Sequence, residues 1–201
     1  MQTLALANAT KGEITAVDTA EEYLAELRSR AQAESLSSRI NFRNEDMNSL
    51  SVRPESFDLI LSEGAAYIMG YANALSVWRK FLKHGGYLAA SELIWLTPDP
   101  PSEAAEFFRD GYPAMTDAEA IAGKFRENGY DLCGHFVLPD SDWWDHYYTP
   151  LEAKFPALAE KYKNDEAALE VLESTHREID IRRRYPDAYG YAFFVGRVPS
   201  H

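Results

Sequence analysis

Short apolar runs alternate with longer amphipathic segments between residues 12 and 96, and this rhythm constrains the fold more than any other feature of the chain. The apolar runs have the length of buried parallel strands. They are GEITAVD (12–18), RINFRNED (39–46), FDLILSEG (57–64) and GYLAASELIWL (86–96). The segments at 19–35 and 73–86 carry apolar residues at helical spacing, with Tyr23 on the inward face of the first and Gly85-Gly86 closing the second. Strands that alternate with helices form right-handed βαβ units, so the sequence predicts an α/β fold with a largely parallel sheet.

The remaining segments extend this pattern towards both ends of the chain. Short helices are predicted at 2–10, 102–110 and 116–128, and strands at 128–139 and 189–199. Helices and a run of aromatic residues fill the stretch between the last two strands. We therefore expect one domain over residues 1–201, with a helical and aromatic insertion at about 140–188.

Composition narrows the classes of partner. The chain has 20 lysines and arginines against 32 acidic residues, a formal net charge of −12, which repels phosphate at long range. We therefore expect neither a nucleic-acid nor a membrane partner, and the run Arg182-Arg183-Arg184 is the only basic candidate. The single cysteine, Cys133, excludes an intrachain disulfide and is predicted to be a core residue rather than a nucleophile. With no signal peptide or spanning segment in view, the sequence predicts a cytoplasmic protein.

Acidic residues stand where the predicted strands end. They fall at Asp18, at Glu45-Asp46-Met47, at Ser62-Glu63 and at Ser91-Glu92. In an open α/β sheet, ligands bind outside the carboxyl ends of the strands, and an acid there can accept both hydroxyls of a ribose. A carboxylate at a strand end can equally be only a cap for the next helix. The pattern therefore indicates a nucleoside site as one reading and helix caps as the other.

Taken together, these segments resemble the S-adenosylmethionine-dependent methyltransferases with the seven-stranded Rossmann-like fold. The resemblance is carried by GEITAVD, RINFRNEDMNSL, FDLILSEGAAYIMG, WRKFLKHGGYLAASE, YGYAFFVGR and the segment SDWWDHYYTP. It implies a three-layer, mostly parallel sheet whose last strand is antiparallel, and S-adenosylmethionine as the cofactor. It places Asp18 on the ribose, Asp46 on the adenine amino group and Met47 against the adenine ring. Ser62 and Glu63 would complete the cofactor site, with Glu63 lining the place of methyl transfer.

One departure from that family concerns the glycine-rich turn. Members begin with a strand and a GxGxG turn that holds the amino acid end of the cofactor, and this chain contains no such motif. Its first residues are similar to the helix that follows the turn, so the first strand is expected to be missing. A start assigned too late, a shortened chain and natural loss would each explain this. Strands 12–18 and 57–62, the neighbours of that strand, would then pair with each other, be covered or be exposed. We expect weak or no binding of S-adenosylmethionine by this chain.

Substrate-side candidates cluster in two places. They are Tyr67, Trp143, Trp144, His146, Tyr147 and Tyr148. Rings of this kind can wall a pocket and exclude water, or they can simply pin the insertion to the sheet, which we favour for at least half of them. Glu63 and His146 are the catalytic candidates, because a carboxylate or a near-neutral imidazole can accept a proton. Glu63 can equally only orient loop amides, and His146 can be a surface histidine without a role.

The sequence thus predicts methyl transfer to a small-molecule acceptor, with no metal, because no pair of histidines has a ligand spacing. One alternative is a non-catalytic or shortened protein with the same fold, which the missing turn supports. A second is a nicotinamide-dependent enzyme, which would also need the turn. The helix expected around 166–184 would be a solvated lid or a dimer helix, and a homodimer is left open.

Overall fold

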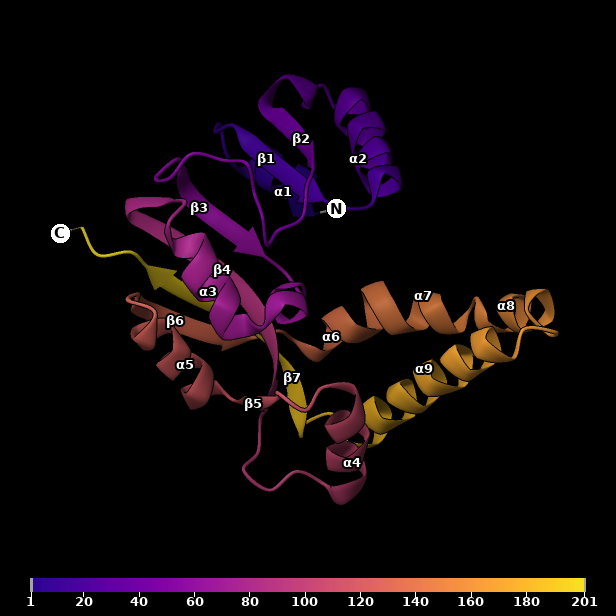
Figure 1. The fold of residues 1–201 in the computed structure, drawn as a ribbon. Helices are drawn as coiled ribbons and strands as arrows, with labels where there is room; N and C mark the ends of the chain where they lie inside the picture. Colours follow the sequence, from indigo (N-terminus) through magenta and orange to yellow (C-terminus); the bar gives the residue numbers. More distant parts are fainter. Residues whose placement is uncertain (1, 201) are drawn as a thin grey trace. The chain divides into compact units, whose positions relative to one another are not determined.

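The computed structural model describes residues 2–200 and divides into two compact units, Met1–Arg53 and Pro54–His201. Figure 1 shows their helices and strands. Each unit contains its own sheet, so the two are described separately. The single domain expected over residues 1–201 stays a prediction.

The first unit is a βαβ element preceded by a helix. Its elements are α1 (Gln2–Ala9), β1 (Ile14–Asp18), α2 (Glu21–Ala33), the 3-10 turn η1 (Ser37–Arg39) and β2 (Ile40–Asn44). β1 and β2 pair in parallel, with Asp18 in register with Asn44. A small apolar core formed by Leu4, Ala7, Ala31, Leu36 and Ile40 holds both helices on the strands. The expected helix at 2–10 and both expected strands are confirmed.

The expected inward face of the second helix is partly wrong. Leu24 and Ala31 are buried, but Tyr23 is 64% exposed. Tyr23 directly precedes Leu24, and neighbouring positions of a helix point about 100° apart, so both cannot face one small core. A tyrosine tolerates the outward position because its hydroxyl stays hydrated.

The second unit is built on a sheet with strand order β3-β4-β7-β6. These strands are β3 (Phe57–Ser62), β4 (Leu82–Trp95), β7 (Tyr189–Arg197) and β6 (Asp131–Val137), and the short β5 (Thr116–Asp117) pairs with β4. β3 and β4 are parallel, whereas β7 is antiparallel to both β4 and β6. A mostly parallel sheet with an antiparallel last strand is therefore confirmed.

Helices cover both faces of this sheet. They include η2 (Ala66–Met69), α3 (Tyr71–Arg79), α4 (Ser102–Gly111) and α5 (Ala118–Glu127). On one face the ring of Phe125 from α5 lies 6.3 Å from Tyr71 and 6.2 Å from Phe194 of β7. On the other face Phe108 of α4 lies 4.6 Å from Tyr189. Tyr189 and Phe194 are an odd number of residues apart, so alternation along β7 sends them to opposite faces.

The helix expected at 73–86 ends earlier than its pattern suggests. α3 stops at Arg79, and the segment around Gly85-Gly86 already belongs to the 14-residue strand β4. A Cβ atom at Gly86 would lie 3.2 Å from the carbonyl oxygen of Phe57, so the glycine permits the close approach of β3. Tertiary pairing therefore overrides the apolar periodicity of residues 80–84.

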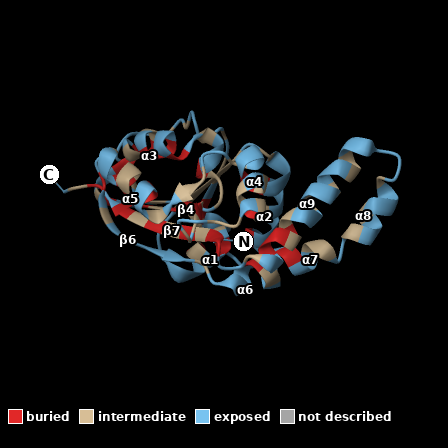
Figure 2. Ribbon diagram, turned by 90° about the horizontal axis from the view of Figure 1, so that it is seen from below, coloured by how far each residue is buried: buried red, intermediate tan, exposed pale blue. Residues whose placement is uncertain are grey.

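The insertion between β6 and β7 is helical, as expected. It comprises α6 (Asp140–Trp143), a π-helical turn η3 (Trp144–Tyr148), α7 (Thr149–Glu152), α8 (Phe155–Lys161) and α9 (Glu166–Arg184). α8 and α9 form a hairpin, and Figure 2 shows that burial is confined to the end of α9 nearest the sheet. Among the described residues, no helix combines the length and the apolar character needed to cross a membrane.

The two strands expected to flank a missing strand lie in different sheets. Within the described residues β1 pairs with β2 and β3 pairs with β4, so β1 and β3 do not pair with each other. On β3 the side chains of Leu59 and Leu61 are 42% and 40% exposed. Apolar residues of a parallel strand are normally covered. Of the three outcomes expected for these strands, β3 therefore shows the exposed one.

Cys133 corrects another expectation. It lies in β6, as expected, but its side chain is exposed rather than part of the core. β6 is the last strand in the order of its sheet, and most of its residues are exposed. A strand at the edge of a sheet buries fewer of its side chains, and this explains the difference.

Two glycines should respond to alanine in opposite directions. A Cβ atom at Gly196 would lie 2.4 and 2.7 Å from ring atoms of the buried Phe125, whereas one at Gly123 in α5 meets open space. Gly196→Ala should lower the melting temperature Tm by about 2–10 °C, since overpacking costs roughly 1–3 kcal/mol. Gly123→Ala should raise Tm by about 2–4 °C through helix propensity. Thermal unfolding followed by circular dichroism measures both, and equal shifts would contradict the packing described here.

Candidate functional site

The carboxyl ends of β1 and β2 are tied together by a side chain. Nδ2 of Asn44 donates to the carbonyl oxygens of Asp18 at 3.3 Å and Thr19 at 2.9 Å. Oδ1 of Asp18 accepts the backbone N–H of Ala20 at 2.8 Å, just before α2 begins. α2 begins after Ala20 without a side-chain cap, so Asp18 fixes the turn before the helix rather than capping it. This bond engages one of its two carboxylate oxygens.

The turn after β2 holds two further carboxylates. Oδ1 of Asp46 accepts the backbone N–H of Asn48 at 2.8 Å and its side-chain amide at 2.9 Å, and these bonds hold the pKa of Asp46 below its ordinary value. Glu45 accepts the N–H of Ser51 and a bond from Arg43, which lower its pKa likewise. Asp46 is exposed, and Met47 beside it is half-buried. Asp18 and Asp46 thus stand at adjoining strand ends, each with a carboxylate that accepts hydrogen bonds.

Residues after β3 form the corresponding turn of the second unit. Ser62 is buried and Glu63 is exposed. The N–H of Gly64 donates to Oγ of Ser91 at 2.8 Å, which fixes the turn to β4. Gly64 has a φ of +58°, and a Cβ atom there would meet nothing within 4 Å. The glycine is therefore required by the backbone conformation.

A buried carboxylate lies inside β4 rather than at its end. Glu92 is only 3% exposed, three residues before the strand ends at Trp95. The hydroxyl of Tyr112, the residue after α4, donates to Oε1 of Glu92 at 2.5 Å. Burial raises the pKa of Glu92, although the bond from Tyr112 opposes this. The sequence placed Glu92 among the strand-end acids but gave no reason to choose it as a site residue. Its surroundings depend on Tyr112, which the end of α4 brings into contact with β4.

Four tyrosines lie near this carboxylate or near the tyrosine that binds it, and we call Tyr67, Tyr112, Tyr147 and Tyr191 the tyrosine cluster. The rings of Tyr67 and Tyr112 lie 5.7 Å apart, edge to face. Burial raises the pKa of Tyr191 to about 12, and the charge of Glu92 adds to the effect. Tyr67 acts electrostatically on Tyr147 and on Tyr191, so all four hydroxyls share one region. Tyr67 and Tyr147, predicted on the substrate side, are thus brought to the same place.

The other aromatic candidates hold the insertion in position. Trp143 is 7% exposed and stacks on Tyr148 at 5.5 Å. The guanidinium of Arg182 lies over Trp143, 4.6 Å from the ring centroid, and pairs with Asp140 at 2.6 Å. Half-buried Trp144 donates its indole N–H to Asp140 at 2.9 Å. These contacts attach the insertion to the sheet, which is the structural role expected for at least half of the candidates. The side chain of His146 is exposed.

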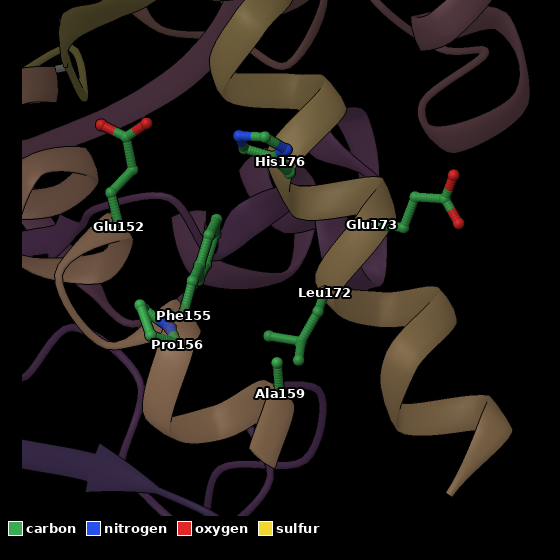
Figure 3. A pocket seen from close by; sticks show the side chains of 7 residues that line it. All are labelled: Glu152, Phe155, Pro156, Ala159, Leu172, Glu173 and His176. Atoms are coloured by element: carbon green, nitrogen blue, oxygen red, sulfur yellow. The ribbon is translucent and has the colours of Figure 1, made fainter. Parts of the chain in front are cut away.

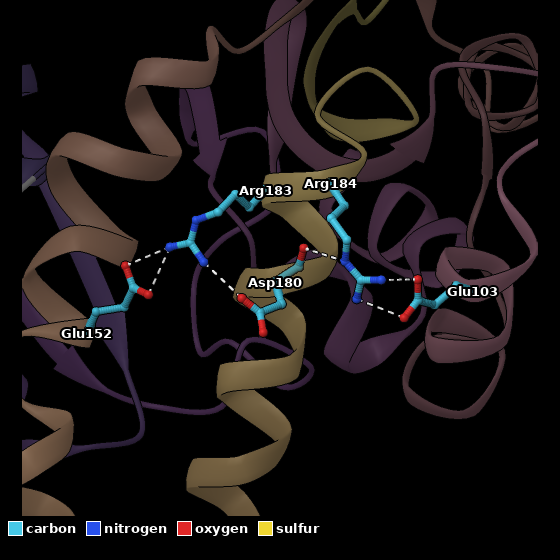
Figure 4. A network of polar contacts seen from close by, with 5 residues as sticks. All are labelled: Glu103, Glu152, Asp180, Arg183 and Arg184. Carbon is cyan, nitrogen blue, oxygen red and sulfur yellow. Dashed lines mark hydrogen bonds and ion pairs between the residues drawn. The ribbon is translucent and has the colours of Figure 1, made fainter.

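The basic run at the end of α9 is paired with acids. Figure 4 shows Arg183 bonded to Glu152 at 2.9 and 3.1 Å and to Asp180 at 2.8 Å. Arg184 binds both oxygens of Glu103 on α4, at 2.5 and 2.8 Å. These pairs tie α9 to its neighbours and neutralise the run, which leaves little net charge to attract phosphate.

A cavity of about 550 Å³ opens between α8 and α9 (Figure 3). It is lined by Glu152, Phe155, Pro156, Ala159, Leu172, Glu173 and His176. The ring of Phe155 meets that of His176 edge to face at 5.8 Å. All seven residues come from the helical insertion, and none follows a strand. The described residues also contain no group of three or more side chains suited to hold a metal ion.

The amino-acid sequence is similar to methyltransferase sequences. Residues 1–86 match the model of the family described as "Methyltransferase domain". The uncharacterized protein YjhP of Escherichia coli is 27% identical over 161 residues, which cover 78% of this chain and 63% of that protein. The chain therefore spans less than two thirds of the length of this relative.

Solved structures agree with the sequence comparisons. The [4+2]-cyclase SpnF has a TM-score of 0.77 at 20% identity, with 99% of this chain and 70% of that chain covered. A Thiobacillus denitrificans S-adenosylmethionine-dependent methyltransferase, solved with S-adenosylhomocysteine, has a TM-score of 0.75 at 20% identity, covering 95% and 77%. The structure of YjhP has 0.74 at 22% identity, covering 93% and 76%. This chain has the class I methyltransferase fold, so the predicted fold family is confirmed.

Removing the charge of Glu92 should stabilise the protein in a pH-dependent way. Because burial raises its folded-state pKa above the ordinary 4.5, the stability that Glu92 contributes is present below pH 4.5 and is lost as the pH rises through the folded-state value. Glu92→Gln keeps an oxygen for Tyr112 and should raise Tm by about 2–4 °C at pH 8. Near pH 4.5 the two proteins should melt together. A constant offset at both pH values would contradict a buried, titrating carboxylate.

Arg182 should matter far more than a surface arginine. Its side chain is 3% exposed and donates to Asp140 and to the carbonyl oxygen of Tyr189. Arg182→Met keeps an apolar stem between the rings but leaves both acceptors without their donor, so Tm should fall by roughly 4–10 °C. Arg126→Met, which breaks a surface pair with Glu119, is the matched control and should change Tm by about 1 °C. Equal shifts in calorimetry would show that the buried pair does not anchor the insertion.

Proposed function

We propose that this protein transfers a methyl group from S-adenosylmethionine to a small-molecule acceptor. One observation carries the proposal: Asp18 and Asp46 stand at the adjoining ends of β1 and β2, inside the region that matches the methyltransferase family. A nucleoside offers hydroxyl and amino donors, and ionised carboxylates are the acceptors that suit them. The fold alone supports the same proposal more weakly, since one fold serves several functions.

The residues present fit the nucleoside part of the cofactor. Asp18 has one oxygen engaged by Ala20, so its second oxygen is assigned to the ribose. Asp46 keeps a lowered pKa and is assigned to the adenine amino group, with half-buried Met47 against the ring. Ser62 and Glu63 stay further cofactor-site residues that the sequence predicts. The 201 residues contain no GxGxG motif for the amino acid end, so we expect the affinity of this chain to be weak.

When bound, the cofactor supplies an electrophilic methyl carbon on a sulfonium sulfur. The protein's task is to orient the acceptor and, where the acceptor loses a proton, to accept it. No covalent bond to the enzyme is required. Glu63 and His146 are exposed and remain our proposed proton acceptors from the sequence, while Tyr67, Trp143, Trp144 and Tyr147 remain the proposed substrate-side residues.

Location and assembly belong to the same proposal. A single cysteine and a net charge of −12 support a reducing, cytoplasmic environment and a small-molecule partner rather than a polyanion. The exposed hairpin of α8 and α9 supports a homodimer as a further part of the proposal.

A second candidate is a protein of this fold without methyltransferase activity. SpnF, with a TM-score of 0.77, is described as a [4+2]-cyclase, so its likeness does not by itself favour methyl transfer. Transfer of a labelled methyl group to any acceptor would exclude it, whereas cofactor binding alone would not.

Ligand-observed NMR with S-adenosylhomocysteine tests the cofactor assignment. We expect saturation transfer to the adenine and ribose protons, with a Kd above roughly 100 µM, about −5.5 kcal/mol. Asp18→Asn and Asp46→Asn should each weaken binding by about tenfold, because each loses a charge-assisted hydrogen bond. Competition by unlabelled S-adenosylmethionine provides the second readout.

Asp58→Asn is the matched control, since the Asp58 side chain is 84% exposed and pairs only with Lys83 among the ion pairs of the described residues. It should bind S-adenosylhomocysteine like the parent chain. The absence of any saturation transfer to S-adenosylhomocysteine, or equal saturation transfer to NADH, would contradict the proposal. Unchanged affinity in both aspartate variants would refute the assignment of these two residues.

A further inference from the structure

Glu92 is a buried acid that the proposed cofactor site does not use. The backbone N–H of Leu93 bonds its carboxylate, and four side chains act on it: Tyr71 on α3, Tyr112 after α4, Lys124 on α5 and Tyr191 on β7. Burial raises the pKa of each of the three tyrosines, so their hydroxyls are neutral at pH 7. A carboxylate placed at 3% exposure without a closely paired cation is costly, and such groups concentrate at functional sites.

Aromatic rings connect the buried Glu92 to the surface of the second unit. Tyr112 binds Oε1 of Glu92 at 2.5 Å, and the ring of Tyr67 lies 5.7 Å from that of Tyr112. Tyr67 and Tyr147 are 48% and 52% exposed, so the outer part of the tyrosine cluster is accessible. A second acid, Glu178, accepts from Tyr148 at 2.7 Å and also acts on Tyr147 and Tyr191.

We infer that Glu92 and the tyrosine cluster form an acceptor subsite for an amine, which binds as its ammonium ion. The inference rests on the proposed function and adds the chemical class of the acceptor to it. Two carboxylates and four tyrosine rings favour a cation, since ring faces attract positive charge and a buried carboxylate makes a charge-assisted hydrogen bond. The same field repels a carboxylate or phosphate ligand. A neutral alcohol would gain neither interaction.

Glu92 also takes the proton that the ammonium must lose before its nitrogen can react. The N–H bond breaks, its electron pair stays on nitrogen as the lone pair, and the proton forms an O–H bond on the carboxylate. The raised pKa makes Glu92 a stronger base than an exposed glutamate.

Three probes of similar shape test the class of acceptor: 2-phenylethylamine, 2-phenylethanol and 3-phenylpropionate. Their affinities are measured by ligand-observed NMR at pH 7.5, with and without S-adenosylhomocysteine, so the readout does not depend on turnover. We expect the amine to bind at least about tenfold more tightly than the other two. Equal affinities, tighter binding of the acid or alcohol, or no binding by any probe would overturn the inference.

Variants then locate the preference at Glu92. Glu92→Gln keeps an acceptor for Tyr112 and removes the charge, so the preference for the amine should disappear while the alcohol binds as before. Tyr112→Phe should reduce the preference in part. Glu106→Gln, at an exposed position of α4, is the matched control and should leave it unchanged. A preference that survives in Glu92→Gln would overturn the assignment. Thermal unfolding of each variant confirms that it is folded.

The two proposals fail in distinguishable ways. If S-adenosylhomocysteine binds but the amine preference is absent, the subsite is wrong and the cofactor assignment stands. If the amine preference is present and depends on Glu92 but S-adenosylhomocysteine does not bind, the proposed function fails and the cation site stands.

Discussion

The antiparallel ladder between β4 and β7 is the constraint on which the second unit depends. It runs from the pair Tyr87–Arg197 to the pair Trp95–Tyr189 and joins segments separated by about 100 residues of chain. The ladder places Phe194 and Tyr189 on opposite faces, so each face acquires its own aromatic core. It also fixes where the insertion returns to the sheet. The ladder also brings Tyr191 of β7 close to Glu92 of β4.

Polar groups in this unit fall into two kinds. Arg182 is buried between the rings of Trp143 and Tyr189, and its charge is neutralised by Asp140. Glu92 is equally buried, yet its closest partner is a neutral tyrosine. A satisfied ion pair is typical of a structural anchor, whereas a carboxylate whose pKa rises on burial is typical of a site that binds or moves a proton. This contrast separates the aromatic residues that pin the insertion from those of the tyrosine cluster.

The strand ends illustrate how far a sequence pattern reaches. Apolar runs followed by acids correctly placed Asp18 and Asp46 at adjoining ends of β1 and β2, because parallel strands in one sheet end at the same edge. The same pattern treated Glu92 as a strand end, but β4 continues to Trp95 since its pairing with β7 extends that far. It also made Tyr23 inward and Cys133 buried, because a local pattern does not contain the position of a small core or of a sheet edge.

The sequence by itself determined the α/β class, nearly all of the helices and strands, the antiparallel last strand, the helical insertion and the acids of the first unit. The antiparallel last strand follows from the family resemblance, and the others follow from local periodicity or from the direction that a connection imposes on a chain. Only the tertiary structure decided that Glu92 is buried, that Tyr67, Tyr112, Tyr147 and Tyr191 converge, and that Arg182, Arg183 and Arg184 at the end of α9 are paired. These properties depend on contacts between residues as much as 81 positions apart, and no local pattern encodes such contacts.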